Sequence, residues 1–88
     1  MKLILAILTE LDANGVQQRL LEHQFRVTHI ASTGGFLRRG STTLLIGLEA
    51  ERVEDALAVL RSACEAPAAS GQSRVTVFVL DVARFEQF

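Results

Sequence analysis

Four segments of the chain carry the β-branched and aliphatic residues that strands prefer. We expect strands at Lys2–Thr9, Arg26–Ser32, Ser41–Leu48 and Val75–Leu80. The first and last of these segments are apolar at successive positions, which indicates strands covered on both faces of a sheet. Two further segments, Ala13–His23 and Ala50–Glu65, repeat apolar residues at helical spacing, and Asp12 is suited to cap the first. The expected apolar stripe of the first helix is Ala13, Val16, Leu20 and Leu21.

The order of these elements, β-α-β-β-α-β, predicts an α+β ferredoxin-like fold, in which both helices cover one face of a four-stranded antiparallel sheet. Its length of 88 residues predicts a single domain over residues 1–88. The other face of the sheet would be apolar and bare, so we expect copies of the chain to cover it in a cyclic oligomer. We expect the tail, Asp81–Phe88, to form a short helical turn or irregular segment that packs Phe85 and Phe88.

The segment between the second and third strands, Thr33–Gly40, holds two adjacent glycines, a phenylalanine and two arginines. Consecutive glycines can turn backbone N–H groups toward one anion, a phenylalanine ring can stack on a base, and guanidinium groups suit phosphate. The same glycine pair also suits an ordinary tight turn, with Phe36 folded into the core. Arg26 and Thr28 favour the binding interpretation, because they lie two residues apart and share one face of their strand.

Composition and charge exclude several classes of function. The net charge of −1 argues against a general nucleic-acid binder, which usually carries a basic patch. No apolar run reaches the roughly 18 residues of a membrane span, and the apolar N-terminal segment lacks the small-residue cleavage site of a signal peptide. We therefore expect a protein that is not inserted in a membrane. The single cysteine excludes an intrachain disulfide framework and fits a reducing compartment, so we expect the protein to be cytoplasmic.

The residues that usually carry catalysis are sparse. His23 and His29 are the only histidines, and we expect structural or surface roles for both. Cys64 lies on the apolar stripe of the second helix, which indicates a buried, unreactive thiol. No cluster of histidine, cysteine or carboxylate has the spacing of metal ligands. We therefore predict no catalytic residue, no metal site and no cofactor.

One stretch resembles a known family: R-V-T-H-I-A-S-T-G-G-F-L-R-R-G-S-T-T-x-x-x-G, from Arg26 to Gly47. It is similar to the signature of the PII-like cyclic-di-AMP receptor proteins, which also share the opening M-K-L-I-x-A-I and the ending T-V-F-V followed by F-x-Q-F. The resemblance implies a homotrimer of ferredoxin-like subunits. It also implies a non-enzymatic signalling protein that binds cyclic di-AMP in clefts between subunits and relays the signal to an unknown downstream protein.

The resemblance further implies which residues contact the ligand. They are Arg26, Thr28, Gly35, Phe36, Leu37, Gly47, Phe78 and Gln87, together with Ser41 where the family usually has asparagine. Thr28 and Gln87 would read adenine edges, Phe36 or Phe78 would pack on a base, and Arg26 would hold phosphate. The connection Ala66–Arg74 replaces a longer loop, rich in proline and glycine, that the family has before the last strand.

Three alternatives stay open at the level of the sequence. The shortened Ala66–Arg74 connection and Ser41 leave open a trimeric interaction module that has lost ligand binding. Adenine nucleotides such as ATP or ADP are alternative ligands, because they offer the same phosphates and base. A small enzyme of ferredoxin-like fold is the weakest alternative, since no nucleophile–base pair is visible.

Overall fold

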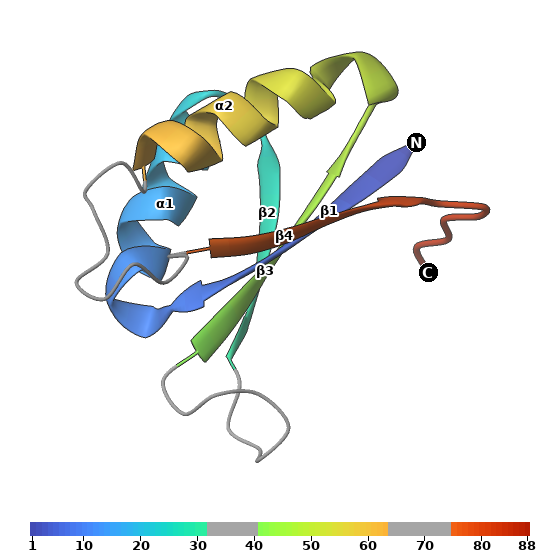
Figure 1. Ribbon diagram of the computed structural model, residues 1–88. Helices are drawn as coiled ribbons and strands as arrows, with labels where there is room; N and C mark the ends of the chain where they lie inside the picture. Colours follow the sequence, from blue (N-terminus) through green and yellow to red (C-terminus); the bar gives the residue numbers. More distant parts are fainter. Residues whose placement is uncertain (32–40, 64–74) are drawn as a thin grey trace.

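The computed structural model describes residues 1–31, 41–63 and 75–88 and contains four strands and two helices in the expected order (Figure 1). The elements are β1 (Lys2–Thr9), α1 (Glu10–Glu22), β2 (Arg26–Ala31), β3 (Ser41–Leu48), the 3₁₀ turn η1 (Ala50–Arg52), α2 (Val53–Ala63) and β4 (Val75–Asp81). The β-α-β-β-α-β order confirms the ferredoxin-like fold. Neither α1 nor α2 is long and apolar enough to cross a membrane.

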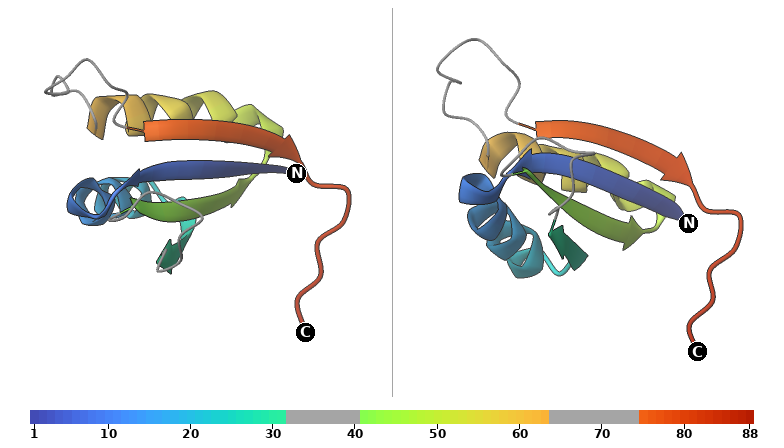
Figure 2. Two further views of the ribbon diagram at one scale, coloured as in Figure 1. Left: turned by 60° about the horizontal axis from the view of Figure 1, so that its bottom comes forward. Right: turned by 90° about the horizontal axis from the view of Figure 1, so that it is seen from below.

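The sheet is antiparallel throughout, with the strand order β2-β3-β1-β4. β1 is central and pairs with β3 on one side and β4 on the other. β2 and β4 form the two edges of the sheet. The tail leaves β4 close to the N-terminus, where the Val82 N–H donates a hydrogen bond to the Met1 carbonyl at 3.1 Å (Figure 2).

The hydrophobic core lies between the sheet and the two helices. It consists of Ile4, Ala6, Leu8, Leu44, Ile46 and Leu48 from the sheet, Ala13, Val16, Leu20 and Phe25 from α1 and the turn after it, and Ala56, Val59 and Leu60 from α2. The alternate residues of β1 and β3 supply the sheet side of this core, as a period of two requires. Each buried valine, leucine or isoleucine side chain in this core contributes about 1.5–3 kcal/mol to stability. Their burial holds the two helices against this one face of the sheet.

The first helix begins earlier than its sequence predicts. Thr9, the last residue of β1, is the N-cap, and its Oγ1 accepts a hydrogen bond from the Asp12 N–H at 3.3 Å. The expectation that Asp12 caps a helix from Ala13 is therefore wrong. Thr9 has an extended backbone at the end of the strand, so its hydroxyl can cap at once, and Asp12 falls in the first helical turn. Leu21 is 52% exposed and does not belong to the apolar stripe.

A Schellman motif ends α1 and starts β2. The Phe25 N–H donates to the Leu20 carbonyl at 3.0 Å, and the Gln24 N–H donates to the Leu21 carbonyl at 2.9 Å. Gln24 has a left-handed φ of 66°, a conformation that glycine usually supplies at this position. A residue with a Cβ costs about 1–2 kcal/mol there, so Gln24 is held against its own preference.

Two expectations about the second half of the chain need correction. The segment expected as one helix from Ala50 begins as the 3₁₀ turn η1, and α2 starts only at Val53; Cys64 and Glu65 lie outside the described residues. The tail does not pack Phe85 and Phe88, whose side chains are 61% and 112% exposed. Residues 82–88 run irregularly away from the domain (Figures 1 and 2).

Candidate functional site

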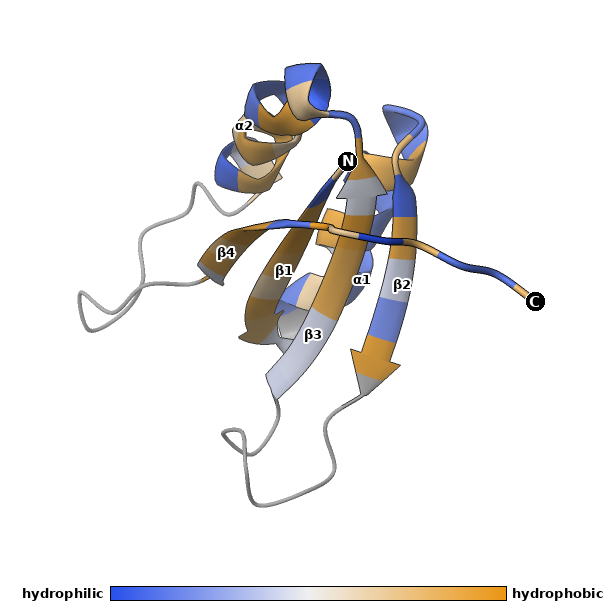
Figure 3. Cartoon of the chain, turned by 90° about the vertical axis from the view of Figure 1, so that its right-hand side faces the viewer, coloured by the Kyte–Doolittle hydropathy of each residue, from blue (hydrophilic) through white to orange (hydrophobic). Residues whose placement is uncertain are grey.

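The face of the sheet opposite the helices, here called the open face, is made of alternate residues of all four strands (Figure 3). Its residues are Arg26, Thr28 and Ile30 of β2; Ser41, Thr43, Leu45 and Gly47 of β3; Leu3, Leu5 and Ile7 of β1; and Thr76, Phe78 and Leu80 of β4. Ile30, Phe78 and Leu80 are each 45–50% exposed. The sequence thus places large apolar side chains on a surface that no helix of the described residues covers.

Five of the sequence-predicted site residues lie on this open face. They are Arg26, Thr28, Ser41, Gly47 and Phe78. Arg26 and Thr28 are exposed on the edge strand β2, whereas Ser41 is largely buried at the start of β3. Gln87 is exposed in the tail. Gly35, Phe36 and Leu37 lie outside the described residues.

Arg26, Thr28 and Gly47 are brought together by the β2–β3 ladder. Arg26 is directly opposite Gly47, and Thr28 is the next residue of β2 on the same face. Because Gly47 has no side chain, the space beside Arg26 stays open to a ligand. Within the part of the chain that the structure describes, only the end of a flexible side chain approaches this space, since a methyl group at position 47 would lie 3.1 Å from Met1 Cε.

Phe78 lies at the opposite edge of the same sheet. The row that contains it runs Thr28, Leu45, Leu5, Phe78 across the four strands. Three inter-strand spacings of about 4.8 Å separate Thr28 from Phe78, or about 14 Å in total. Two leucines fill that distance, so a single chain does not bring the phenylalanine ring into contact with Arg26 and Thr28.

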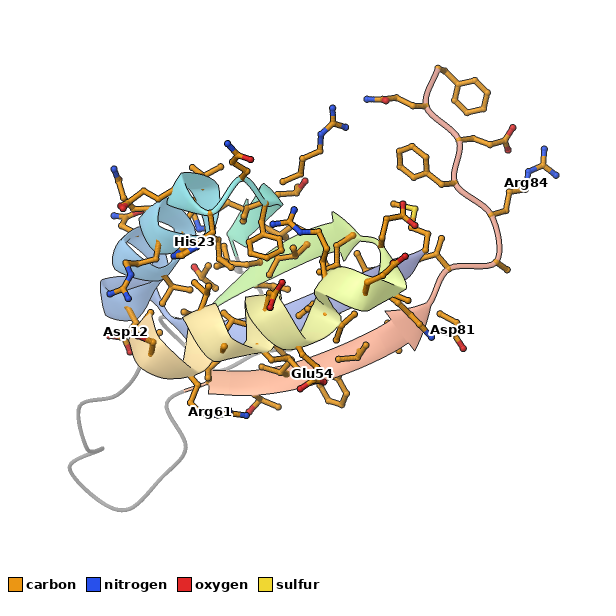
Figure 4. All side chains as sticks on the ribbon, turned by 90° about the horizontal axis from the view of Figure 1, so that it is seen from above. Asp12, His23, Glu54, Arg61, Asp81 and Arg84 are labelled. Carbon is orange, nitrogen blue, oxygen red and sulfur yellow. The ribbon has the colours of Figure 1, made fainter. Side chains whose placement is uncertain are left out.

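A surface cavity of about 240 Å³, here called the corner cavity, adjoins Arg26 where β2 begins and β3 ends. It is lined by Gln24, Phe25, Arg26, Gly47, Leu48, Glu49 and Arg52. Arg52 contacts two other residues at this cavity. The Arg52 Cζ lies 4.1 Å from the centre of the Phe25 ring, and the Arg52 Nη2 donates a hydrogen bond to the His23 carbonyl at 3.1 Å (Figure 4, where His23 is labelled).

Sequence reasoning missed the three polar residues Gln24, Glu49 and Arg52 in this cavity. Two signals were present in the sequence. Arg52 is a cation in the acidic segment Glu51–Asp55, and Gln24 stands where the end of a helix favours glycine. The cavity itself could not be predicted, because it depends on the packing of η1 against the turn after α1.

One carboxylate near the sheet has a shifted pKa. Lys2 of β1 donates a hydrogen bond to the carboxylate of Asp81, its cross-strand partner in β4, and this hydrogen bond and the lysine charge lower the pKa of Asp81. His23 and His29 are both exposed, as expected for surface histidines. No group of three or more histidine, cysteine or carboxylate side chains gathers at a metal-binding distance among residues 1–31, 41–63 and 75–88.

The fold and the open face define a small ferredoxin-like protein with candidate ligand contacts on its strands. A family model described as "Cyclic-di-AMP receptor" matches residues 1–70, and the chain therefore belongs to the cyclic-di-AMP receptor family. This match confirms the resemblance seen in the sequence.

The solved structures that are similar to this chain include the following two. A functionally unknown protein from Pediococcus pentosaceus ATCC 25745 shares 35% identity with a TM-score of 0.78, and the match covers 99% of this chain and 96% of that one. A DUF3240 family protein from Shewanella baltica OS155 shares 13% identity with a TM-score of 0.72, over 99% of this chain and 94% of that one. At that identity, the second match supports the fold alone.

Proposed function

We propose that this protein is a non-enzymatic signalling receptor that binds cyclic di-AMP on the open face of its sheet, between copies of the chain. The match of residues 1–70 to the cyclic-di-AMP receptor family carries this proposal. The grouping of Arg26, Thr28 and Gly47 at one end of β2 and β3 supports it, because these residues offer a cation, a hydroxyl and an open backbone surface.

The chemistry of these residues suits a cyclic dinucleotide. The guanidinium of Arg26 is planar and always charged, so it can hold a phosphodiester by paired hydrogen bonds. The hydroxyl of Thr28 can donate to or accept from a base edge. An aromatic ring such as that of Phe78 contributes about 1–3 kcal/mol when a base stacks on it. A few such interactions reach the ~8 kcal/mol of a micromolar site after the cost of association.

The site is shared between copies in this proposal. Arg26 and Thr28 lie on one edge of the sheet and Phe78 lies on the other, so a ligand between them requires the β2 edge of one copy near the β4 edge of another. Burial of the half-exposed apolar side chains of the open face would favour the association of those copies. A ring of three copies, as the resemblance implies, would close such contacts without leaving a free edge.

The bound state would then be read by a partner protein. A receptor without a catalytic centre can signal only if the bound and free forms differ in their affinity for something else. The single cysteine in the sequence supports a reducing compartment, and we propose that this signalling takes place in the cytoplasm.

Calorimetric titration of the wild-type protein with cyclic di-AMP, cyclic di-GMP, ATP and ADP tests this function. We expect cyclic di-AMP to bind most tightly, and Arg26→Ala to weaken its binding about tenfold, or about 1.4 kcal/mol. Arg61→Ala is the matched control, because Arg61 is an exposed arginine in the last turn of α2 and lies off the open face. A trimer that binds none of the four nucleotides would instead be an interaction module that has lost its ligand.

A further inference from the structure

The backbone at the end of α1 has the left-handed conformation that glycine usually adopts, yet the residue there is Gln24. The Schellman bonds from Gln24 and Phe25 hold this position at a φ of 66°, where a side chain is unfavourable. A residue held in a sparsely populated conformation next to a cavity is a reason to ask what its side chain does. Gln24 is exposed, so burial in the core does not explain it.

Gln24 lines the corner cavity together with Arg26 and Gly47. The cavity therefore continues from the open face around the start of β2. The cavity has a volume of about 240 Å³. Pockets that enclose a whole drug-sized ligand are larger, at about 300–1,000 Å³. The cavity is large enough for one part of a dinucleotide rather than for all of it.

The polar groups of the cavity indicate which part that is. Glu49 contributes a carboxylate, which repels phosphate but accepts hydrogen bonds from an amino group or a ribose hydroxyl. Arg52 contributes a planar guanidinium already supported by the Phe25 ring, and bases stack on such planes. Gln24 contributes a neutral amide with both donors and an acceptor, the combination that pairs with the edge of adenine. These three groups fit a purine base.

We propose that the corner cavity is a purine subsite of the ligand site, in which the Gln24 amide recognises the edge of one adenine. This inference rests on the proposed binding of cyclic di-AMP, and it adds a specificity-determining residue that the nine sequence-predicted contacts do not include. In this arrangement Arg26 holds the phosphate at the mouth of the cavity, and Gln24 reads the base that lies inside it.

The variant Gln24→Gly tests the subsite, because it changes stability and binding in opposite directions. Glycine relieves the left-handed strain, so the thermal midpoint measured without ligand at fixed protein concentration should rise by several degrees. Loss of the amide should weaken cyclic di-AMP about fivefold in calorimetry, which is the effect of one neutral hydrogen bond. The preference for cyclic di-AMP over cyclic di-GMP should fall by a similar factor.

Gln18→Ala is the matched control, since it removes an exposed amide from α1 outside the cavity and should leave affinity unchanged. Equal affinity of Gln24→Gly and wild type for cyclic di-AMP would overturn the subsite and leave the receptor function intact. Failure of the wild type itself to bind cyclic di-AMP would overturn both, so the two failures are distinguishable.

Discussion

Gly47 lies directly opposite Arg26 and beside Leu3, at the point where the open face meets the corner cavity. Nothing about its backbone demands glycine in the way that a turn does, and its use here is the space that it leaves above the sheet. Gly15 is a useful contrast. It lies in α1, and a methyl group there would meet nothing within 4 Å.

We predict that Gly47→Ala weakens the binding of cyclic di-AMP by tenfold or more, because the new methyl group occupies the space beside Arg26. The fold should tolerate the change, since the group it approaches is the flexible end of Met1. Gly15→Ala should bind normally and gain about 0.5–1 kcal/mol of stability as a helical alanine. Calorimetry and chemical denaturation of both variants check this, and normal binding by Gly47→Ala would contradict the site.

The lowered pKa of Asp81 makes a second prediction at this scale. A carboxyl whose folded pKa lies below its unfolded value of about 3.8 stabilises the fold above that pH, and this stabilisation is lost as the pH falls through the folded pKa. Asp81→Asn should therefore be less stable than wild type at pH 7, and the difference should disappear in acid.

The effect should be small, because the Lys2–Asp81 pair is at the surface. Glu86→Gln is the control for the loss of one negative charge, since Glu86 pairs with Arg84 at 3.0 Å within the tail and outside the sheet. Denaturant midpoints measured from pH 7 down to pH 2 give the comparison. A stability difference that persists unchanged in acid would show that the lysine–aspartate pair is not its source.

At the scale of the elements, β1 and α1 join without a loop, and the cap at Thr9 is what makes this junction possible. Replacing Thr9 by alanine removes the hydroxyl that satisfies the Asp12 N–H and should cost about 1 kcal/mol of stability. Thr9→Ser keeps the hydroxyl and should cost much less. Denaturant unfolding distinguishes the two, and equal losses in both variants would assign the effect to the methyl group instead.

The sequence predicted the elements well where one signal dominated. The strand Lys2–Thr9 was predicted with its observed bounds, because its unbroken run of apolar residues between Lys2 and Thr9 is typical of a central strand. The start of α1 was missed, since Thr9 and Asp12 are both good caps and only the strand that ends at Thr9 decides between them. The tail was misjudged because the phenylalanines Phe85 and Phe88 suggested burial, whereas both side chains are exposed in the single chain.

The candidate site was only partly accessible to sequence reasoning. Arg26 and Thr28 could be assigned to one face from their spacing alone, and the cross-strand pairing with Gly47 agrees with it. The distance between Thr28 and Phe78 could not be anticipated, because it depends on two strands that lie between them in space but not in sequence. The place of Arg52 in the cavity could not be anticipated either, because it depends on the packing of Arg52 against the Phe25 ring.

At the scale of the whole molecule, the half-exposed apolar side chains of the open face favour association between copies of the chain. We predict that Leu80→Glu on this face disrupts the proposed trimer, because it buries a charge between copies. Leu21→Glu on α1 should leave the trimer intact. The two leucines are 45% and 52% exposed in the single chain, so neither change should unfold it. Sedimentation velocity measures the outcome, and an intact trimer in Leu80→Glu would exclude this face as the interface.

Native mass spectrometry of the wild-type protein with cyclic di-AMP tests the shared site most directly, because it reports chain number and bound ligand together. We predict a species of three chains that binds up to three molecules of cyclic di-AMP, with no ligand on dissociated single chains. A single chain that binds cyclic di-AMP by itself, or a trimer that binds none at saturating concentration, would contradict a ligand site formed between copies.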